Sequence, residues 1–341
     1  MLQGWTLRSG EDSVDIAARG ALVTAWRVTD SSGTRRDLID GYRNDEEAQR
    51  LSGYRSAVLA PWSNRIRDAR FVFDEAASDL GPDENGVREA LHGLVADATF
   101  VELERGEDFV QAACQIAATD AYPYPLQVHV LYRLWGTQGR HRLELVLKVA
   151  NTGQSDAPVT LGWHPYLRYQ GPRELASIVL PAVTAIRTDP ANIPLPGQDA
   201  FVDLSENIGG AFTPDQRVSC LGQTVVIQAP AGLDHAFTDV HRDNDEWVRA
   251  YLRHGDGTEV AVEFQPDEIA RGVGVFQVFT GEPLEERSGE AVAIEPCLAM
   301  TDAFNRSECA SAIRLAPGQI RSLRAGLSFS ESASSSLSND R

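Results

Sequence analysis

Residues 126–149 read LQVHVLYRLWGTQGRHRLELVLKV, and this stretch decides the fold. Apolar side chains stand at every second position on both sides of the segment 136–139, which has a glycine at each end. Neighbouring side chains of a strand point to opposite faces, so this spacing gives each strand one apolar face. The pattern predicts an antiparallel hairpin. The apolar positions are Leu126, Val128, Val130, Tyr132 and Leu134 before the turn, and Leu143, Leu145, Leu147 and Val149 after it.

The same period of two extends over most of the chain, and helical periodicity is almost absent. We expect a short helix or a loop in the charged stretch 37–52, and long connecting loops in the Pro- and Gly-rich stretch 181–222. Further strands are expected at 22–28, 71–73, 98–104, 110–117, 159–164, 225–228, 247–253, 260–264, 273–279, 291–294 and 323–329. About twenty short strands without helical partners predict an all-β protein, built as a large antiparallel sandwich.

The domain organisation is expected to be simple. The sequence has no internal repeat of fixed period, and large all-β domains run as one unit at this length. Residues 1–329 are therefore expected to form a single domain. Residues 330–341 are rich in serine and are expected to be a disordered tail.

Composition excludes several classes of partner. The 341-residue chain has 43% hydrophobic residues and a net charge of −18, which argues against nucleic acid because phosphate binding needs a basic surface. No stretch approaches the roughly 20 apolar residues of a membrane helix, and the N-terminus does not resemble a signal peptide. We expect a cytoplasmic monomer or homodimer. Its cysteines, Cys114, Cys220, Cys297 and Cys309, are expected to be reduced thiols.

Common catalytic and cofactor motifs are missing from the sequence. It contains no GxxxxGK[ST], no GxGxxG between a strand and a helix, and no GxSxG, so nucleotide cofactors and serine hydrolysis lack support. In the tract 234–241, Asp239 and His241 have matching strand parity and could bind a metal ion. No other His-rich segment completes such a site, so we expect no metal.

Residues 161–169 read LGWHPYLRY and place His164 among aromatic side chains. Alternation puts Thr160 and Gly162 on its face, so that small side chains leave room beside the imidazole. Pro165 cannot donate a ladder hydrogen bond, so the strand is expected to end there with His164 at the rim, beside Tyr166. A rim histidine near aromatic rings suits a sugar or a flat ligand. The alternative interpretation is a histidine satisfied in the sheet core.

Residues 291–296 read AVAIEP and present Glu295 in a similar way. Val292 and Ile294 face one side, so Ala293 shares the face of Glu295 and leaves room beside the carboxylate. A proline follows the titratable residue here as well, so this strand is also expected to end. Glu295 taken alone could simply be a solvated carboxylate. The common presentation favours His164 and Glu295 as an acid–base pair.

Six short segments resemble the aldose 1-epimerases, also called galactose mutarotases, and stand in the order of that family. They cover the chain from about residue 60 to 305 and imply a galactose mutarotase-like β-supersandwich. The segments are Asn64-Arg65-Ile66, Leu91-His92-Gly93, Gly162-Trp163-His164-Pro165-Tyr166, Leu233-Asp234-His235-Ala236-Phe237, Phe279-Thr280-Gly281, and Glu295-Pro296 followed by Asp302-Ala303-Phe304-Asn305.

The resemblance implies a role for each matched residue. His164 corresponds to the general acid that protonates the ring oxygen O5 of a monosaccharide, and Glu295 to the general base that takes the proton of the C1 hydroxyl. Ring opening, rotation about C1–C2 and reclosure then give the other anomer. The resemblance implies no metal or organic cofactor. The residues that it assigns to sugar binding are Arg65 and His92 for hydroxyls and the ring oxygen, Asp234 for neighbouring hydroxyls, and Gln277 near the pocket.

This reaction is expected near neutral pH if Glu295 stays ionised and holds the His164 pKa near or above its free value. Trp62, Trp163 and Tyr166 are candidates to stack on the sugar, although each could instead lie in the core. Two rival functions remain. One is a non-catalytic carbohydrate-binding protein, and the other is a glycoside hydrolase or lyase-like enzyme in which two carboxylates flank the bond.

Two segments depart from the family's pattern. Asp68 and Ala69 stand where the family commonly has Gly-Gly or Gly-Lys, so the loop beside Arg65 is expected to differ. The run Cys297–Thr301 replaces the residues that usually follow Glu-Pro. Both changes are expected to affect the choice of sugar more than the acid and the base.

Overall fold

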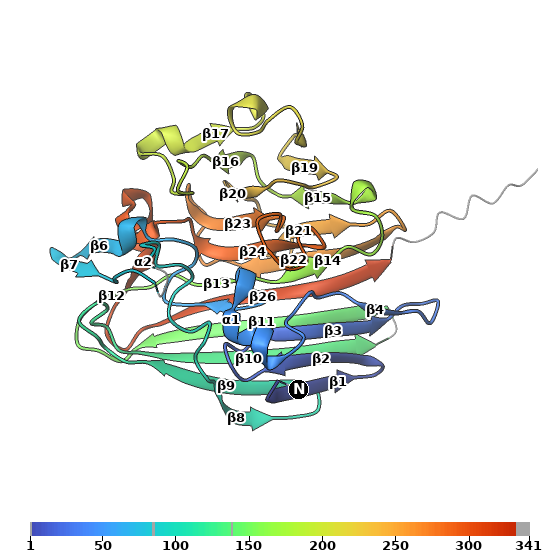
Figure 1. The fold of residues 1–341 in the computed structure, drawn as a ribbon, viewed down its shortest axis with the longest axis horizontal. Coiled ribbons are helices and arrows are strands. Elements are labelled where there is room, and N and C mark those ends of the chain that lie inside the picture. The colour runs from blue at the N-terminus through green and yellow to red at the C-terminus, as the bar shows by residue number, and fades with distance from the viewer. Residues whose placement is uncertain (1, 84–85, 138, 332–341) are drawn as a thin grey trace, which may run out of the picture.

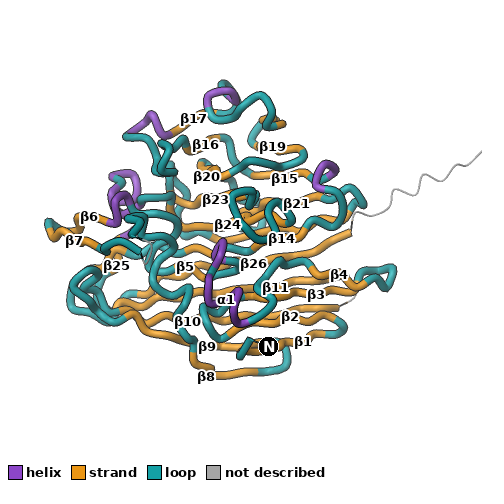
Figure 2. Tube along the Cα trace, in the orientation of Figure 1, coloured by secondary structure: helices purple, strands orange, loops and turns teal. Residues whose placement is uncertain are grey.

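Antiparallel sheets dominate the fold, as the alternating sequence predicts, and long loops join their strands (Figures 1 and 2). The computed structural model describes residues 2–83, 86–137 and 139–331, and all neighbouring strands named in these ranges pair antiparallel. None of the helices within these ranges is long and apolar enough to cross a membrane. Ser330 and Glu331 still belong to the last strand, and the rest of the expected tail lies outside the described residues.

The larger sheet has ten strands and contains the predicted hairpin, next to β9 and β8 at one edge. β10 (Leu126–Thr137) and β11 (Arg140–Asn151) pair in an unbroken register from Leu126↔Asn151 to Thr137↔Arg140. The order of strands is β18 (Arg217–Leu221), β19 (Thr224–Gln228), β15 (Ser177–Leu180), β21 (Val248–Arg253), β22 (Thr258–Gln265), β26 (Ile320–Glu331), β11, β10, β9 (Phe109–Ile116) and β8 (Val101–Arg105).

The second sheet has eight strands and carries the candidate site. Its order is β17 (Phe201–Asp203), β16 (Thr184–Ile186), β20 (Asp234–Thr238), β23 (Val273–Phe279), β24 (Ala291–Ala299), β13 (Gly162–Trp163) and β5 (Val58–Leu59), with β14 (Tyr166–Arg168) also paired to β24. The apolar faces of the two large sheets share one core, because Leu145 of β11 and Ile294 of β24 belong to the same buried cluster. This cluster extends in sequence from Trp5 to Phe329.

Smaller elements complete the fold. Four strands form a separate sheet in chain order: β1 (Gly4–Ser9), β2 (Asp12–Ala17), β3 (Val23–Thr29) and β4 (Arg35–Asp37). Two-stranded pairs are β6 (Arg70–Phe73) with β7 (Ala76–Asp79), and β12 (Ala157–Pro158) with β25 (Arg314–Leu315). The α-helices are α1 (Asp45–Arg50) and α2 (Ala310–Ile313). The 3₁₀ turns are η1 (Ser52–Tyr54), η2 (Arg67–Ala69), η3 (Arg173–Leu175), η4 (Gly197–Ala200), η5 (Ile208–Gly210), η6 (Ala303–Asn305) and η7 (Ser307–Cys309).

Several expected boundaries are wrong. The stretch 181–222 is not only loops, since it contains β16, β17 and β18, each too short to show a clear period. The strand expected at 159–164 is reduced to Gly162–Trp163, and pairing with β24 resumes after Pro165 as β14. β24 does not end at Pro296 but continues to Ala299.

Candidate active site

His164 and Glu295 face each other across neighbouring strands. β24 pairs with β13 at Gly162↔Cys297 and with β14 at Tyr166↔Ala293. Extending either register inward places His164 opposite Glu295, in the short interruption between β13 and β14. The prolines therefore act differently from the expectation: they accompany a local break in one ladder, and they do not end both strands.

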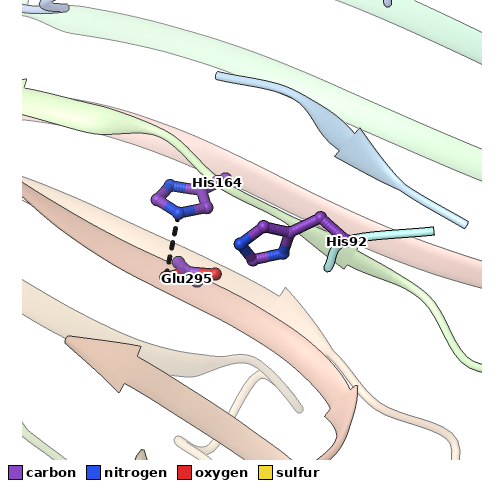
Figure 3. Close-up of side chains that lie close together, drawn as sticks. All are labelled: His92, His164 and Glu295. Carbon is purple, nitrogen blue, oxygen red and sulfur yellow. Dashed lines mark ion pairs between the residues drawn. The ribbon is translucent and has the colours of Figure 1, made fainter. Parts of the chain in front are cut away.

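The two side chains are buried and in contact (Figure 3). His164 Nε2 lies 3.3 Å from Glu295 Oε1. His164 is 4% exposed and Glu295 is 2% exposed. Glu295 is therefore not a solvated carboxylate, and His164 does not stand at an open rim. The predicted parity of β24 is confirmed, because Val292 and Ile294 belong to the main core while Ala291 and Ala293 pack with Tyr166 on the other face.

His92 joins the pair from a tight loop. Its φ is +62° and that of Gly93 is +81°, and a Cβ on Gly93 would lie 2.2 Å from the carbonyl oxygen of Ala60. Only glycine fits there, and its positive φ lets the chain turn tightly beside His92. The His92 ring meets the His164 ring edge-on at 5.0 Å between centroids. The backbone N–H of Asn64 donates to His92 Nδ1 at 3.2 Å, so in the neutral ring Nε2 carries the proton and is a donor.

The other sequence-predicted residues come from three further segments. Arg65 follows β5, pairs through Nε with Glu89 at 3.1 Å, and also lines the cavity. Asp234 begins β20 and accepts hydrogen bonds from Gln277 Nε2 at 2.5 Å and from Asn192 Nδ2 at 3.1 Å. Gln277 stands beside Glu295 in the register of β23 and β24. Gln277 therefore contacts Asp234 of β20 from the neighbouring strand β23.

One cavity of about 190 Å³ brings most of these residues together. Drug-sized ligands occupy pockets of roughly 300–1,000 Å³, so this volume suits one monosaccharide better than a longer chain. Gln277 lines an adjoining narrow recess together with Asp234 and Asn192. The lining residues of the cavity are Gly53, Tyr54, Asn64, Arg65, Leu91, His92, His164, Tyr166, Asp234, Phe279, Leu284 and Glu295.

Of the three aromatic candidates, Tyr166 lines the cavity and the two tryptophans do not. Trp62 and Trp163 are buried in the core, where their indole N–H groups donate to the carbonyl oxygens of Ala90 and Ser56. Tyr54 is not predicted from the sequence, and its ring lies 4.7 Å from that of His92. Its place in the cavity follows from tertiary contacts, which no local pattern indicates.

Burial sets the protonation of the site. Burial is the main cause that lowers the pKa of His164 to about 3, and burial followed by the nearby charge of Asp234 raises the pKa of Glu295 well above its usual range. Burial also lowers the pKa of His92, helped by His164 and Arg65, and raises that of Asp234. The expectation that the Glu295 charge holds the His164 pKa near or above its free value is therefore wrong, because burial lowers that pKa. Burial favours the neutral form of both residues in the protein without sugar.

His92, His164 and Glu295 could also be considered as metal ligands, since one donor atom from each lies within 4.8 Å of the others. The tautomer of His92 opposes this use. Ligation through Nε2 would move its proton to Nδ1, which already faces the N–H of Asn64. The three side chains suit hydrogen bonds to hydroxyl groups better than a metal ion.

The loop beside Arg65 keeps a conformation that glycine usually adopts. Asp68 and Ala69 both have positive φ, at +54° and +55°. The departure from the glycine pattern of the family therefore leaves two residues in a costly left-handed conformation. The backbone N–H of Arg67 donates a hydrogen bond to Asp302 Oδ1 at 2.9 Å, which helps to hold this loop.

The chain matches the sequence model of the aldose 1-epimerase family over residues 3–328. It is 26% identical over 249 residues to the uncharacterised protein YihR of Escherichia coli, covering 73% of this chain and 71% of that protein. It is 28% identical over 173 residues to rat galactose mutarotase, covering 50% of this chain and 48% of the relative. The match thus spans about half the length of that mutarotase.

Solved structures share the fold at low sequence identity. The galactose 1-epimerase of Lactobacillus acidophilus superposes with a TM-score of 0.71 at 15% identity, covering 96% of this chain and 93% of that one. An aldose epimerase homologue of Caenorhabditis elegans gives 0.73 at 14% identity, covering 97% and 99%. The galactose mutarotase-like sandwich predicted from the sequence is confirmed. The full-length match to the family model shows that the chain belongs to the aldose 1-epimerase family.

Proposed function

We propose that the protein interconverts the α and β anomers of a free aldose by acid–base ring opening and reclosure. The observation that carries this proposal is the contact of His164 with Glu295 inside a cavity the size of one sugar. Mutarotation needs one group that donates a proton while another accepts one, and each can contribute on the order of a hundredfold.

The proton balance of the pair fits this reaction. Ring opening starts from the ionised pair, which is reached when the Glu295 proton passes to His164 across their contact; it then moves a proton from the C1 hydroxyl to Glu295 and another from His164 to O5. Afterwards the carboxyl is protonated and the imidazole is neutral, which is the state that burial favours in the free protein. Reclosure on the other face of the aldehyde returns both protons. The 3.3 Å contact also allows one proton to pass directly between the two residues.

Sugar binding falls to the polar side chains around the pair. The Arg65 guanidinium and the His92 Nε2–H are donors for sugar oxygens, and the Asp234 carboxylate is an acceptor for hydroxyl groups. Gln277 holds Asp234 and leaves it lone pairs for the substrate. The apolar side chains of the cavity, among them Phe279 and Leu284, can cover the C–H groups of the sugar ring.

A glycoside hydrolase that uses Asp234 and Glu295 is the second candidate, because both carboxylates line the cavity. The small volume and the engagement of Glu295 with His164 favour the epimerase. A protein that only binds sugar would not need a buried, contacting acid–base pair, whose desolvation is costly.

The test is polarimetry on freshly dissolved α-D-galactose and α-D-glucose, extended to pentoses and deoxy sugars. We expect the purified protein to speed the change of optical rotation for at least one sugar, and the His164→Gln variant to act as the inactive control. Inactivity across the panel would overturn the proposal. Release of nitrophenol from nitrophenyl glycosides, lost in Glu295→Gln, would instead support the hydrolase.

We also propose that residues 1–329 fold as one domain. A single cluster of buried apolar side chains includes Trp5 near one end and Phe329 at the other. Single-step unfolding that is coincident by circular dichroism and tryptophan fluorescence is the expected result. Two separate transitions would contradict it.

A further inference from the structure

The His164 imidazole lacks the hydrogen bond that usually orients a catalytic histidine. Its Nε2 contacts Glu295, while Nδ1 is buried without a hydrogen-bond partner among the described residues. In many acid–base histidines the second ring nitrogen bonds to a carboxylate or a carbonyl, and this bond fixes the ring. Here ring contacts take that place: Tyr166 stacks on His164 at 5.1 Å with 5° between planes.

Tyr166 in turn is held through its ring. Its hydroxyl is buried and has no hydrogen-bond partner in the part of the chain that the structure describes. Ala291 and Ala293 pack against it but are small. The guanidinium of Arg55 lies over the ring, with Cζ 4.6 Å from the centroid. A cation this close to an aromatic face is attracted to it, most strongly where water is excluded.

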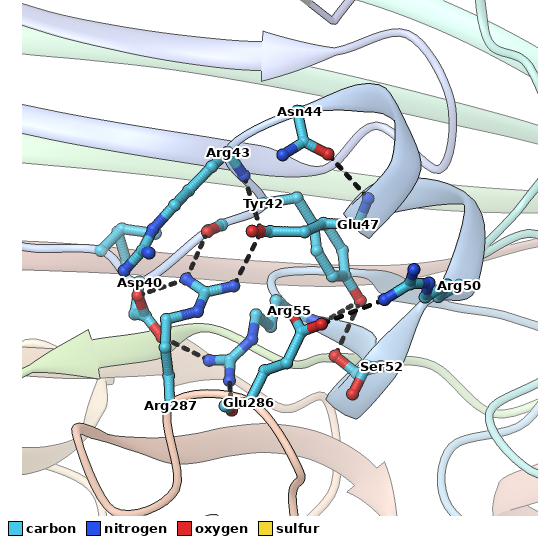
Figure 4. A network of polar contacts seen from close by, with 12 residues as sticks. Asp40, Tyr42, Arg43, Asn44, Glu47, Arg50, Ser52, Arg55, Glu286 and Arg287 are labelled. Carbon is cyan, nitrogen blue, oxygen red and sulfur yellow. Dashed lines mark hydrogen bonds and ion pairs between the residues drawn. The ribbon is translucent and has the colours of Figure 1, made fainter.

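Arg55 is fixed by a buried polar network (Figure 4). Its Nη1 donates to Asp40 Oδ2 at 2.5 Å, its Nη2 donates to the carbonyl of Glu286 at 3.3 Å, and its backbone N–H donates to the hydroxyl of Tyr42 at 3.1 Å. Arg55 is 2% exposed and Asp40 is fully buried. Buried ion pairs often add little to the free energy of unfolding. We therefore look for the role of this network in the side chains that it positions.

We propose that Arg55 is a positioning residue for the proposed reaction: it fixes the ring of Tyr166 and, through that ring, the plane of the His164 imidazole. The backbone around Arg55 supports the same side chain. The N–H of Ser56 donates to the carbonyl of His164 at 2.8 Å, and the N–H of His164 donates to the carbonyl of Ala57 at 3.0 Å. Segment 54–57 therefore holds His164 by its main chain and by its ring.

The charge of Arg55 gives a second, separable effect. The charged and titratable groups around the imidazole are Glu295 from β24, His92 from its loop, Tyr166 from β14 and Arg55 from segment 54–57, with Arg65 beside His92. Burial is the main cause of the low His164 pKa, and the guanidinium of Arg55 lowers it further. Removing that charge therefore shifts the titration of His164 to higher pH.

The experiment compares Arg55→Met with a matched control, Arg168→Met. Arg168 pairs with Asp40 Oδ1 at 2.8 Å and also bonds to the carbonyl of Ile39, so its loss removes one partner of the same carboxylate. We expect Arg55→Met to lower kcat by on the order of tenfold or more with a smaller change in KM, because misplaced reacting groups slow the chemical step. Arg168→Met is expected to keep kcat near wild type. Arg55→Lys should restore part of kcat, since the ammonium retains a charge near the ring.

Equal effects on kcat in Arg55→Met and Arg168→Met would mean a structural role only and would overturn the inference. If Arg55→Met does not fold, Tyr166→Leu removes the stacked ring and leaves the Asp40 pairs in place. It is expected to lose kcat to a similar extent, and a wild-type kcat would also overturn the inference.

A readout without sugar separates this inference from the proposed function on which it rests. Imidazole ¹⁵N NMR reports the titration of His164 in the protein alone. A shift to higher pH is expected in Arg55→Met and not in Arg168→Met, even if no tested sugar is converted. An unchanged titration in Arg55→Met would contradict the inference, whereas inactivity of the wild type would contradict only the function.

Discussion

The β10–β11 hairpin and the contact of β13 and β14 with β24 are both antiparallel, yet they differ in what they hold. The hairpin keeps its register from end to end, and the side chains on its inner face are apolar and buried. The second contact has the same register on both sides of a break, and in that break His164 faces Glu295. The hairpin stabilises the fold. The second contact lowers the free energy of unfolding, because it keeps two titratable groups out of water.

A sheet can thus hold two titratable groups in contact. A contact between two flexible loops would leave the distance of the two groups variable. Here strands on both sides of the break set the distance between His164 and Glu295. The free energy that the regular hairpin contributes to folding offsets the cost of burying His164 and Glu295.

The largest expected effect is on the reactive pair. We predict that Glu295→Gln and His164→Gln each lower kcat by on the order of a hundredfold or more, because each removes one proton-transfer group. Thermal stability should fall little or rise, since a costly buried titratable group is lost. Polarimetry and thermal unfolding measure the two effects. If either variant kept a near-normal kcat, the contact of His164 with Glu295 would not differ from the hairpin in its effect on catalysis.

The opposite result is predicted for the hairpin. Leu145 of β11 is fully buried, and Leu145→Ala should lower the free energy of unfolding by about 2–5 kcal/mol through lost burial and a cavity. The folded fraction should keep kcat and KM near wild type. Urea unfolding and polarimetry below the transition check this. A large loss of kcat in folded protein would show that the two regions are coupled.

The pH dependence sharpens the electrostatic side of the comparison. Activity needs one mobile proton on the pair, so it is lost at low pH when neutral His164 gains a proton and at high pH when Glu295 loses one. The acid limb of kcat/KM should fall through the His164 pKa of about 3, and the alkaline limb should lie above the usual pKa of a Glu. A pair with ordinary values would lose activity below about pH 4.3.

The measurement is kcat/KM from about pH 3 to 9, with circular dichroism to confirm that the protein stays folded. An acid limb near the ordinary pKa of a carboxylate, in folded protein, would contradict the neutral pair.

The smallest effect is expected at the edge of the site. Gln277→Ala removes a hydrogen bond to the Asp234 carboxylate, and such a bond to a charged group contributes about 1.5–3 kcal/mol. We expect KM to rise by on the order of tenfold with a smaller change in kcat. Gln115→Ala, in which an exposed amide is lost, is the control. Steady-state kinetics decide, and an unchanged KM would exclude Gln277 from sugar binding.

The sequence was sufficient for the regular parts of the molecule. Alternation over 126–149 predicts both the hairpin and its buried face, and the parity of 291–295 predicts which face carries Glu295. It was not sufficient for β16, β17 and β18, because three to five residues cannot establish a period. Pro165 and Pro296 predict strand ends, whereas the strand pairs on both sides of them keep the same register.

The site was predictable in its residues and not in its electrostatics. The order of short motifs gave Arg65, His92, His164 and Glu295, all of which line one cavity. Protonation depends on how completely water is excluded, and that depends on the packing of distant segments. For the same reason Tyr54 and Leu284 escaped notice, since their places in the cavity follow from tertiary contacts.

The register that joins His164 to Glu295 also limits how this gene can change in length. A single-residue insertion or deletion between Ala293 and Cys297 would turn the Glu295 carboxylate to the opposite face of the sheet and bring an apolar neighbour opposite His164. The turns that join β16, β17 and β18 within 181–222 lie outside the paired strands and have no such phase to keep. Related sequences should therefore vary in length there, while the spacing within 291–299 stays invariant.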